Sequence, residues 1–317
     1  MAGEFEIIAR HFTRPVRRAA LGVGDDCALL QIDAGQQLAV SCDMLVEGRH
    51  FLSSVPADRL GHKALAVNLS DLAACGAQPL AFTLALALPR ADDDFLAGFA
   101  RGMFALADEH GIELVGGDTT AGPLNVCITV FGQVPAGQAL LRSGARVGDD
   151  LWVSGTLGDA RLALEVFRGA VSLPGEVFEV ARRAMELPQA RVALGLALRG
   201  VASSAIDLSD GLVGDLGHVL QSSGVGAVLH ADALPRSAVQ AGMPLALQRQ
   251  CTLSGGDDYE LLFTAPPARR DAVQAAAGRA GVAVTRCGEI VAGSGLRLLD
   301  AAGRDLPVSW RGFDHFA

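Results

Sequence analysis

The sequence has almost no lysine: Lys63 is the single lysine among 26 lysine and arginine residues. Phosphate-binding loops of the P-loop type need a lysine in a G-x-x-x-x-G-K-[ST] segment, and the chain contains no such segment. The glycine-rich strand loop, the V-A-I-K strand and the H-R-D loop of protein kinases are also absent. Both classes of nucleotide enzyme are therefore excluded.

Zinc, disulfide and membrane patterns are missing as well. The six cysteines are scattered without a C-x-x-C pair, so we interpret them as small buried apolar residues in a reducing compartment. The longest apolar run, Leu80–Leu88, is far shorter than the roughly 20 residues of a membrane span. Residues 1–10 lack the basic-then-apolar pattern of a signal peptide. We therefore expect a cytoplasmic protein with no membrane partner.

The charge and the apolar content narrow the kind of protein and its possible partners further. Half of the 317 residues are hydrophobic, which is enough for a packed core and, at this length, for two domains. The net charge of −9 argues against nucleic acid as a partner. An acidic protein can still bind phosphates where divalent cations bridge the two.

Strand-like and helix-like segments alternate in both halves, which predicts an α/β or α+β protein. Residues 135–150 have no periodic apolar pattern and contain three glycines, so we place the domain boundary there. The predicted domains are residues 1–137 and 148–317. Within the first, residues 113–115 are expected to form a short strand that leads into the segment GGDTT.

The segment LAVSCDMLVEGRHF is the first place where the sequence indicates a site. Residues 38–40 are typical of a buried strand, which we expect to end at Ser41, Cys42 and Asp43. His50 follows seven residues after Asp43. A carboxylate at the end of a buried strand, with a basic ring nearby, is typical of ligand sites in α/β proteins.

Aspartates recur beside glycine or serine after apolar runs. They are Asp25, Asp26, Asp43, Asp71, Asp118, Asp207, Asp210, Asp257 and Asp258. Each alone is commonly a turn or helix-cap residue, and we interpret Asp149 and Asp150 only in that way. Asn68 and Asp71 share one face of a predicted helix because they are spaced i, i+3.

The aspartates taken together indicate metal chemistry. Four or more clustered carboxylates without a cation would repel one another and raise some of their pKa values. Oxygen donors without zinc spacing favour Mg²⁺ or Mn²⁺. Several such ions would let an acidic protein hold a polyphosphate and neutralise charge during phosphoryl transfer.

Eight segments, in this order, resemble thiamine-monophosphate kinases: GVGDDCALL, SCDMLVEGRHF, GHKALAVNLSDLAACGA, GGDTT, SGTLGDA, IDLSDGL, SGGDDYELLF and WRGFDHF. LAVNLSD and DLSDGL alone indicate the wider superfamily of aminoimidazole ribonucleotide synthetase and selenophosphate synthetase. The M-L-V-E-G-x-H-F segment and the GFDHF ending are typical of the kinase. The resemblance implies ATP-dependent phosphorylation of thiamine monophosphate to thiamine diphosphate with several Mg²⁺ ions. It also implies a two-domain aminoimidazole ribonucleotide synthetase-like fold and a homodimer whose N-terminal sheets pack into a barrel.

The resemblance implies site residues position by position. Those that match metal positions are Asp26, Ser41, Cys42, Asp43, Asp71, Asp118, Asp207 and Asp210. Those that match ATP positions are Gly117, Asp118, Arg142 and Ser209. Those that match thiamine monophosphate positions are His50, Asp257 and Phe313. Of these, we expect Asp43, Asp71, Asp118 and Asp210 to support catalysis most directly.

Three positions depart from the family pattern. Cys42 stands where threonine is common, so we expect a metal contact there through the backbone, because sulfur is a soft ligand for Mg²⁺. Asp257 stands where glutamate is usual, which keeps the charge and shortens the reach. Phe313 stands where tyrosine is common, which keeps a stacking face and loses a hydroxyl group.

His50 and Arg142 each have an alternative interpretation. The acceptor phosphate is already anionic at neutral pH and needs no strong base, so we interpret His50 as a phosphate-binding donor. Its alternative is a structural histidine at a strand end. Arg142 suits a phosphate clamp, and Arg146 could do the same.

The residues suggest three alternative functions, two of which lack a residue or motif that they would need. A selenophosphate-synthetase-like enzyme would need a reactive cysteine and lysine in the N-terminal glycine-rich loop; Cys27 lies near one, but no lysine precedes Lys63. An aspartyl-phosphate phosphohydrolase would need a D-x-D-x-[TV] motif, which is absent. A non-catalytic Mg²⁺-nucleotide-binding dimer would use the same aspartates.

Overall fold

A computed structural model describes residues 4–310, 312 and 313. Contacts between Cα atoms divide the chain into two compact units. Unit 1 comprises residues 1–72 and 77–137, and unit 2 comprises residues 73–76 and 138–317. Each unit has its own sheet, so the predicted α/β class is confirmed.

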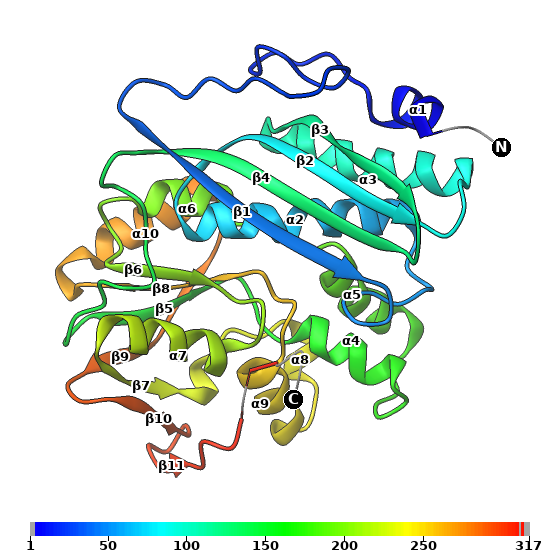
Figure 1. Cartoon of the computed structure of the whole chain (residues 1–317). Helices are drawn as coiled ribbons and strands as arrows, with labels where there is room; N and C mark the ends of the chain where they lie inside the picture. The colour runs from blue at the N-terminus through cyan, green and yellow to red at the C-terminus, as the bar shows by residue number, and fades with distance from the viewer. Residues whose placement is uncertain (1–3, 311, 314–317) are drawn as a thin grey trace. The chain divides into compact units, whose positions relative to one another are not determined.

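Unit 1 is built on a four-stranded sheet with the order β1-β4-β2-β3 (Figure 1). Strands β1 and β2 both pair antiparallel to β4, whereas β2 and β3 are parallel. The strands are β1 Gln36–Val46, β2 Gln78–Leu88, β3 Glu113–Ala121 and β4 Asn125–Pro135. The helical segments are α1 Glu4–Ile7, the π-helical turn η1 Ile8–Phe12, α2 Ala57–Ala74 and α3 Asp93–His110.

Helices α2 and α3 pack closely because glycines face the other helix's backbone. A Cβ atom on Gly61 of α2 would overlap Phe99 O, and one on Gly102 of α3 would overlap Asp58 O. Asp92 caps the N-terminus of helix α3, where its side chain accepts a hydrogen bond from Phe95 N at 3.1 Å. In Figure 1 both helices lie behind the sheet, with β1 in front.

Two strands of unit 1 are longer than the sequence indicates. The expected end of the first strand at Ser41–Asp43 is wrong, because β1 continues to Val46 and stays paired with β4 as far as Asn125. The expected strand end at residue 115 is wrong as well. Strand β3 continues through GGDTT, where Gly117 and Asp118 pair with β2. Neighbouring strands thus supply hydrogen-bond partners that local sequence patterns do not reveal.

Unit 2 is built on a seven-stranded mixed sheet with the order β11-β10-β7-β9-β5-β8-β6. Its strands are β5 Asp150–Ser154, β6 Ser204–Asp207, β7 Gly226–His230, β8 Leu261–Ala265, β9 Val284–Val291, β10 Gly295–Leu299 and β11 Asp305–Leu306. Its helices are α4 Asp159–Phe167, α5 Gly175–Glu186, α6 Val192–Leu198, α7 Leu212–Ser223, α8 Ala238–Ala241, α9 Leu245–Ser254 and α10 Arg270–Ala280, with the 3₁₀ turns η2 Ala231–Ala233 and η3 Pro267–Arg269. None of the helices described in either unit is long and apolar enough to cross a membrane.

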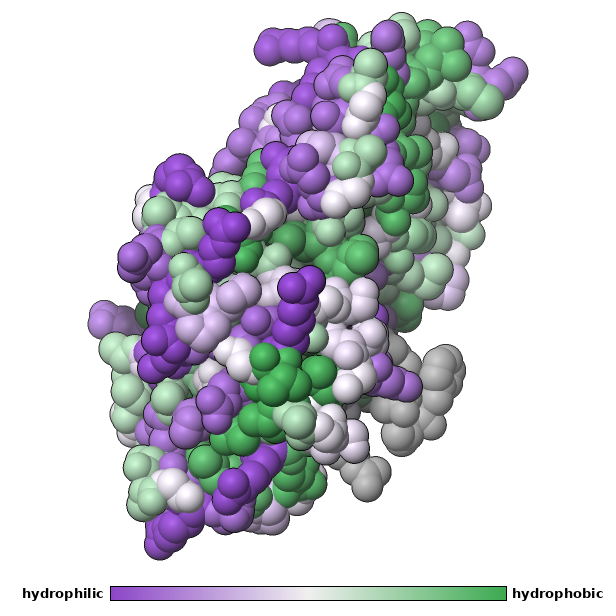
Figure 2. Space-filling view, turned by 90° about the vertical axis from the view of Figure 1, so that its left-hand side faces the viewer, coloured by the Kyte–Doolittle hydropathy of each residue, from purple (hydrophilic) through white to green (hydrophobic). Residues whose placement is uncertain are grey.

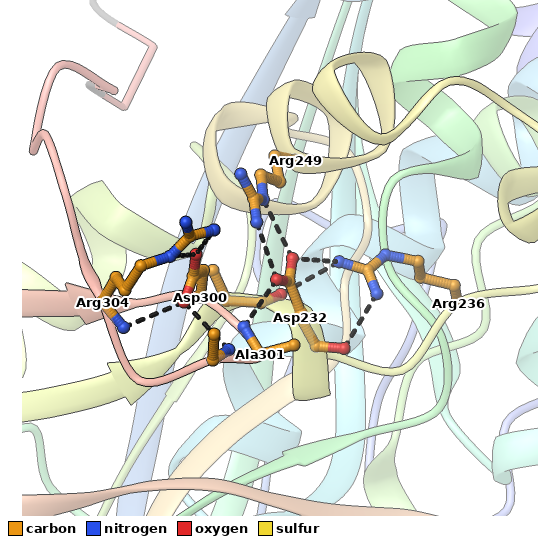
Figure 3. Close-up of polar contacts among 8 residues, drawn as sticks. Asp232, Arg236, Arg249, Asp300, Ala301 and Arg304 are labelled. Atoms are coloured by element: carbon orange, nitrogen blue, oxygen red, sulfur yellow. Dashed lines mark hydrogen bonds and ion pairs between the residues drawn. The ribbon is translucent and has the colours of Figure 1, made fainter.

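Charged networks stabilise the turns of unit 2. Asp232 accepts hydrogen bonds from Arg249 Nε at 2.9 Å and from the backbone nitrogen of Ala301 at 2.8 Å (Figure 3). Asp300 accepts from the backbone nitrogen and from Nε of Arg304, both at 2.9 Å. These contacts hold the turn between β10 and β11 against η2, so we assign this network a structural role.

Candidate active site

The predicted metal positions on β1 are hydrogen-bonded to α2, the helix that follows it. Ser41 Oγ donates to Asp71 Oδ2 at 2.5 Å. Asp43 N donates to Asn68 Oδ1 at 3.0 Å, and the Asn68 amide in turn donates to Ala64 O at 3.0 Å. Asn68 is almost fully buried, so its orientation is fixed before any ligand arrives. The shared helix face of Asn68 and Asp71 therefore meets Ser41 and Asp43.

Cys42 faces away from that contact. Successive side chains alternate across a strand, and Cys42 Sγ lies 3.4 Å from Cys127 Sγ of β4. Burial, together with the hydrogen bond to Cys42, raises the pKa of the Cys127 thiol to about 11. Both sulfurs therefore point to the other face of the sheet from Ser41 and Asp43. A metal contact at Cys42 through its backbone stays a prediction.

A pocket of about 560 Å³ in unit 1 brings three predicted positions together. Asp26 and Asp118 line it with Gly117, and apolar side chains from α1, η1, β2 and β3 complete its wall. Gly117 has a φ of 152°, and a Cβ atom there would overlap Leu84 O. Only glycine fits at this position, where β3 lies against β2.

His50 is oriented by the end of β1. Its Nδ1 accepts a hydrogen bond from Val46 N at 3.0 Å, so the proton of the neutral ring is on Nε2. Lys63 Nζ donates to the carbonyl oxygen of His50 at 3.1 Å. Lys63 is almost fully buried in α2. It is a positioning residue that sequence reasoning missed, although its place in the apolar helical segment GHKALAV was a signal.

In unit 2, the predicted nucleotide and acceptor positions meet. Asp257 N donates to Ser209 O at 2.9 Å, and Phe313 N donates to Asp210 O at 2.8 Å. The loop after β6, the loop before β8 and the tail are therefore tied to one another. Asp207, the last residue of β6, leads into this loop and is only 5% exposed.

The segment GGDDYE contains two residues other than glycine with positive φ. Asp257 has a φ of 66° and Tyr259 a φ of 50°. Aspartate is enriched in this left-handed region, so Asp257 suits its position. Its Oδ1 accepts a hydrogen bond from Tyr259 Oη at 3.0 Å. Tyr259, the single tyrosine, thus orients the Asp257 carboxylate.

Asp258 and Glu260 in the same segment are structural. Asp258 accepts from Gly158 N at 2.8 Å, and burial raises its pKa well above the ordinary value. Glu260 Oε2 accepts from Ser154 Oγ at 2.5 Å and from Arg191 Nε at 2.7 Å. These bonds anchor the segment to β5 and to the start of α6. Glu260 was missed by sequence reasoning because its partners are distant in the chain.

Asp215 is a third missed residue. Its Oδ2 accepts from Asp210 N at 3.2 Å, so it fixes the turn that carries Ser209 and Asp210. Burial, and then the charge of Asp210, raise the pKa of Asp215 to about 7, while the charge of Arg142 acts to lower it. Arg142 therefore lies close enough to influence this turn. The backbone nitrogen of Arg146 donates to Asp149 Oδ2 at 3.0 Å, and the choice of Arg142 as the clamp residue stays a prediction.

The predicted metal donors divide between the units. Unit 1 holds Asp26, Ser41, Cys42, Asp43, Asp71 and Asp118, and unit 2 holds Asp207 and Asp210. Within residues 4–310, 312 and 313, no group of three or more His, Cys, Asp or Glu side chains is arranged to hold a metal ion. The multi-metal cluster therefore stays a prediction.

The two sheets and the residues placed on them define an aminoimidazole ribonucleotide (AIR) synthase-like protein. Residues 24–134 match the N-terminal domain of AIR synthase related proteins, and residues 146–301 match their C-terminal domain. The chain belongs to the thiamine-monophosphate kinase family within this class, which confirms the resemblance seen in its motifs.

The relatives are similar over nearly their whole length. A thiamine-monophosphate kinase of Salmonella typhimurium is 46% identical over 324 residues, which cover 99% of this chain and 98% of the relative. The crystal structure of thiamine-monophosphate kinase from Stenotrophomonas maltophilia K279a is 47% identical with a TM-score of 0.85, covering 92% of this chain and 94% of that one. The structure of AaThiL complexed with AMPPCP and TMP is 29% identical with a TM-score of 0.79, and the match covers 90% of this chain and 89% of that one.

Proposed function

We propose that this protein transfers the γ-phosphoryl group of ATP to thiamine monophosphate, which yields thiamine diphosphate and ADP. The observation that carries the proposal lies in unit 2. There Ser209 and Asp210, which match nucleotide and metal positions, are hydrogen-bonded to Asp257 and Phe313, which match acceptor positions. Relatives named for this reaction and the complex of AaThiL with AMPPCP and TMP support the choice of substrates.

The transfer requires little acid–base chemistry from the protein. A phosphate oxygen of thiamine monophosphate attacks the γ-phosphorus, and the bond from that phosphorus to the bridging oxygen of ADP breaks. The attacking oxygen is already anionic at neutral pH, so no general base is needed. The protein's task is to bind and align two polyanions.

His50 is proposed to bind the acceptor phosphate. Because its Nδ1 accepts from Val46 N at 3.0 Å, the proton on Nε2 makes that nitrogen the donor side of the ring. Lys63 supports the same residue through its carbonyl oxygen. Asp257 and Phe313 are proposed for the thiamine end of the acceptor. Phe313 presents a half-exposed ring that suits stacking.

The nucleotide is proposed to contact Gly117, Asp118, Arg142 and Ser209. Mg²⁺ ions are proposed at Asp26, Ser41, Cys42, Asp43, Asp71, Asp118, Asp207 and Asp210. When bound, Mg²⁺ would neutralise the charge of the polyphosphate. The side-chain donors are oxygen atoms, apart from the Cys42 sulfur that faces Cys127, and oxygen is the ligand that Mg²⁺ prefers. The bonds of Ser41 and Asp43 to α2 pre-orient two of these positions.

We also propose that two copies pair through the outer face of β1, so that their sheets form a barrel. Leu38, Val40 and Met44 alternate along this strand and are 48%, 55% and 54% exposed. Figure 2 shows hydrophobic surface on the side of unit 1 that carries β1 in Figure 1. Exposed apolar stripes of this kind mark protein interfaces. Replacing Val40 by a charged residue should shift the mass measured by analytical ultracentrifugation from that of a dimer, twice 32.7 kDa, to that of a monomer, 32.7 kDa.

A reducing, cytoplasmic setting completes the proposal, since all six cysteines are free of disulfide bonds.

The deciding experiment incubates the purified protein with Mg-ATP and thiamine monophosphate. Thiamine diphosphate and ADP should form in equal amounts. ADP formed without thiamine diphosphate would overturn the kinase assignment in favour of another ATP-using activity. Binding of nucleotide without turnover would indicate a non-catalytic module instead.

A further inference from the structure

The tail of unit 2 meets helix α7 through two glycines. A Cβ atom added to Gly214 of α7 would lie 2.8 Å from Gly312 Cα and 3.3 Å from Gly312 N. A Cβ atom added to Gly312 would lie 3.1 Å from Gly214 Cα. Both contacts are with backbone atoms, which cannot rotate away as a side chain could. The two segments therefore approach this closely only because neither residue has a side chain.

The same short segment is anchored on both sides of Gly312. Trp310 packs against the apolar core of unit 2, and Phe313 N donates to Asp210 O at 2.8 Å. Phe313 is 48% exposed. The backbone path through Gly312 brings it next to the turn that carries Ser209 and Asp210.

We propose that Gly214 and Gly312 are positioning residues that seat the tail and thereby set the affinity for the acceptor. This inference rests on the proposed function, because it acts through Phe313 at the acceptor side. Ordinary contacts of a Cβ atom begin near 3.4 Å, so a methyl group on Gly214 must displace the tail by several tenths of an ångström. The helix is bonded internally, so the tail is the part that yields.

The test compares Gly214→Ala with Gly217→Ala. Gly217 is in the same helix, and a Cβ atom there has nothing within 4 Å. Both substitutions replace glycine by alanine inside α7 and bring the same gain in helix propensity. Any difference between them therefore reports the contact with Gly312.

We expect Gly214→Ala to raise KM for thiamine monophosphate by about 10-fold while KM for ATP changes less than about 2-fold, since misplacing a binding group by under 1 Å has effects on this scale. Gly312→Ala, with its looser 3.1 Å contact, should show a smaller change in the same direction and leaves α7 unaltered. Gly217→Ala should have the same KM for thiamine monophosphate and the same KM for ATP as the unsubstituted chain.

Tail seating is measured separately in a Trp152→Phe background, where Trp310 is the single remaining tryptophan. Gly214→Ala should shift its emission to longer wavelength and increase its quenching by acrylamide, and Gly217→Ala should do neither. Equal KM values in the Gly214 and Gly217 variants, or equal increases for both substrates, would overturn the inference. Lack of thiamine diphosphate formation by the unsubstituted chain would instead overturn the proposed function.

Discussion

Replacing Glu260 by glutamine should destabilise unit 2 more than replacing Asp150 by asparagine. Glu260 is 4% exposed, and its two oxygens face Arg191 and Ser154. Burial alone would lower the pKa of Arg191, but the hydrogen bond and charge of Glu260 outweigh burial and raise it. Glutamine keeps the shape, removes the charge and points an N–H₂ group at one of these donors.

The expected loss in the free energy of unfolding follows from leaving the charge of Arg191 in the interior without its partner. Removing one partner of a buried ion pair costs about 3–5 kcal/mol. The side chain of Arg191 is 22% exposed and can reach some water, so we expect the lower end, about 3 kcal/mol. Ser154 Oγ also accepts from Leu261 N at 2.8 Å, so the loss should spread to the pairing of β5 with β8.

Urea unfolding measured by the fluorescence of Trp152, in a Trp310→Phe background where it is the single tryptophan, is the assay. Trp152 lies in β5 and stacks on Phe263 of β8, so its emission follows the part of the sheet that Glu260 anchors. Glu289→Gln, on the exposed side of β9, is the matched control and should change the free energy of unfolding by less than about 0.5 kcal/mol. A loss below about 1 kcal/mol for Glu260→Gln, with an unchanged m-value, would refute the reasoning.

Three other substitutions test the metal site, the acceptor site and a second ion pair. Asp43→Asn should abolish turnover by disrupting metal binding, and a rate near that of the unsubstituted chain at saturating Mg²⁺ would contradict that role. His50→Ala should raise KM for thiamine monophosphate about 10-fold or more and leave ATP affinity largely intact; equal losses would move His50 to the nucleotide side. Asp150→Asn should lower the free energy of unfolding by about 2 kcal/mol at pH 7, because its carboxylate pairs with Arg270. The hydrogen bond from Arg270 holds the pKa of Asp150 below its ordinary value, so this stabilisation is present above about pH 4. It fades as the pH falls through the lowered pKa, and urea titrations at pH 7 and pH 3 should show the difference shrinking.

The aspartates show how much a local sequence pattern can predict. The sequence pattern of Asp149 and Asp150 is typical of turn or helix-cap residues; in the structure Asp149 accepts from Ser203 Oγ at 2.6 Å, and Asp150 accepts from Arg270 Nε. In GGDDYE the two neighbouring aspartates look alike in sequence, yet Asp257 accepts a hydrogen bond from Tyr259 Oη and Asp258 accepts one from Gly158 N. The partner of each depends on how the chain folds around the segment, and a dipeptide does not contain that information.

Strand ends were the least predictable feature. Apolar runs indicated β1 and β3 correctly but placed their ends too early, because β4 and β2 continue to offer hydrogen bonds beyond the apolar residues. The N-terminal aspartate and C-terminal glycine of α3 act on the backbone beside them.

The sequence by itself determined the α/β class, the exclusion of P-loop chemistry, the family and the i, i+3 pairing of Asn68 with Asp71, since each depends on composition, local periodicity or motif order. The tertiary structure decided that Ser41 meets Asp71, that Lys63 supports His50 and that the tail seats on Gly214. Those contacts join residues far apart in the chain. Sheet register and backbone packing bring them together, and neither can be deduced from local sequence.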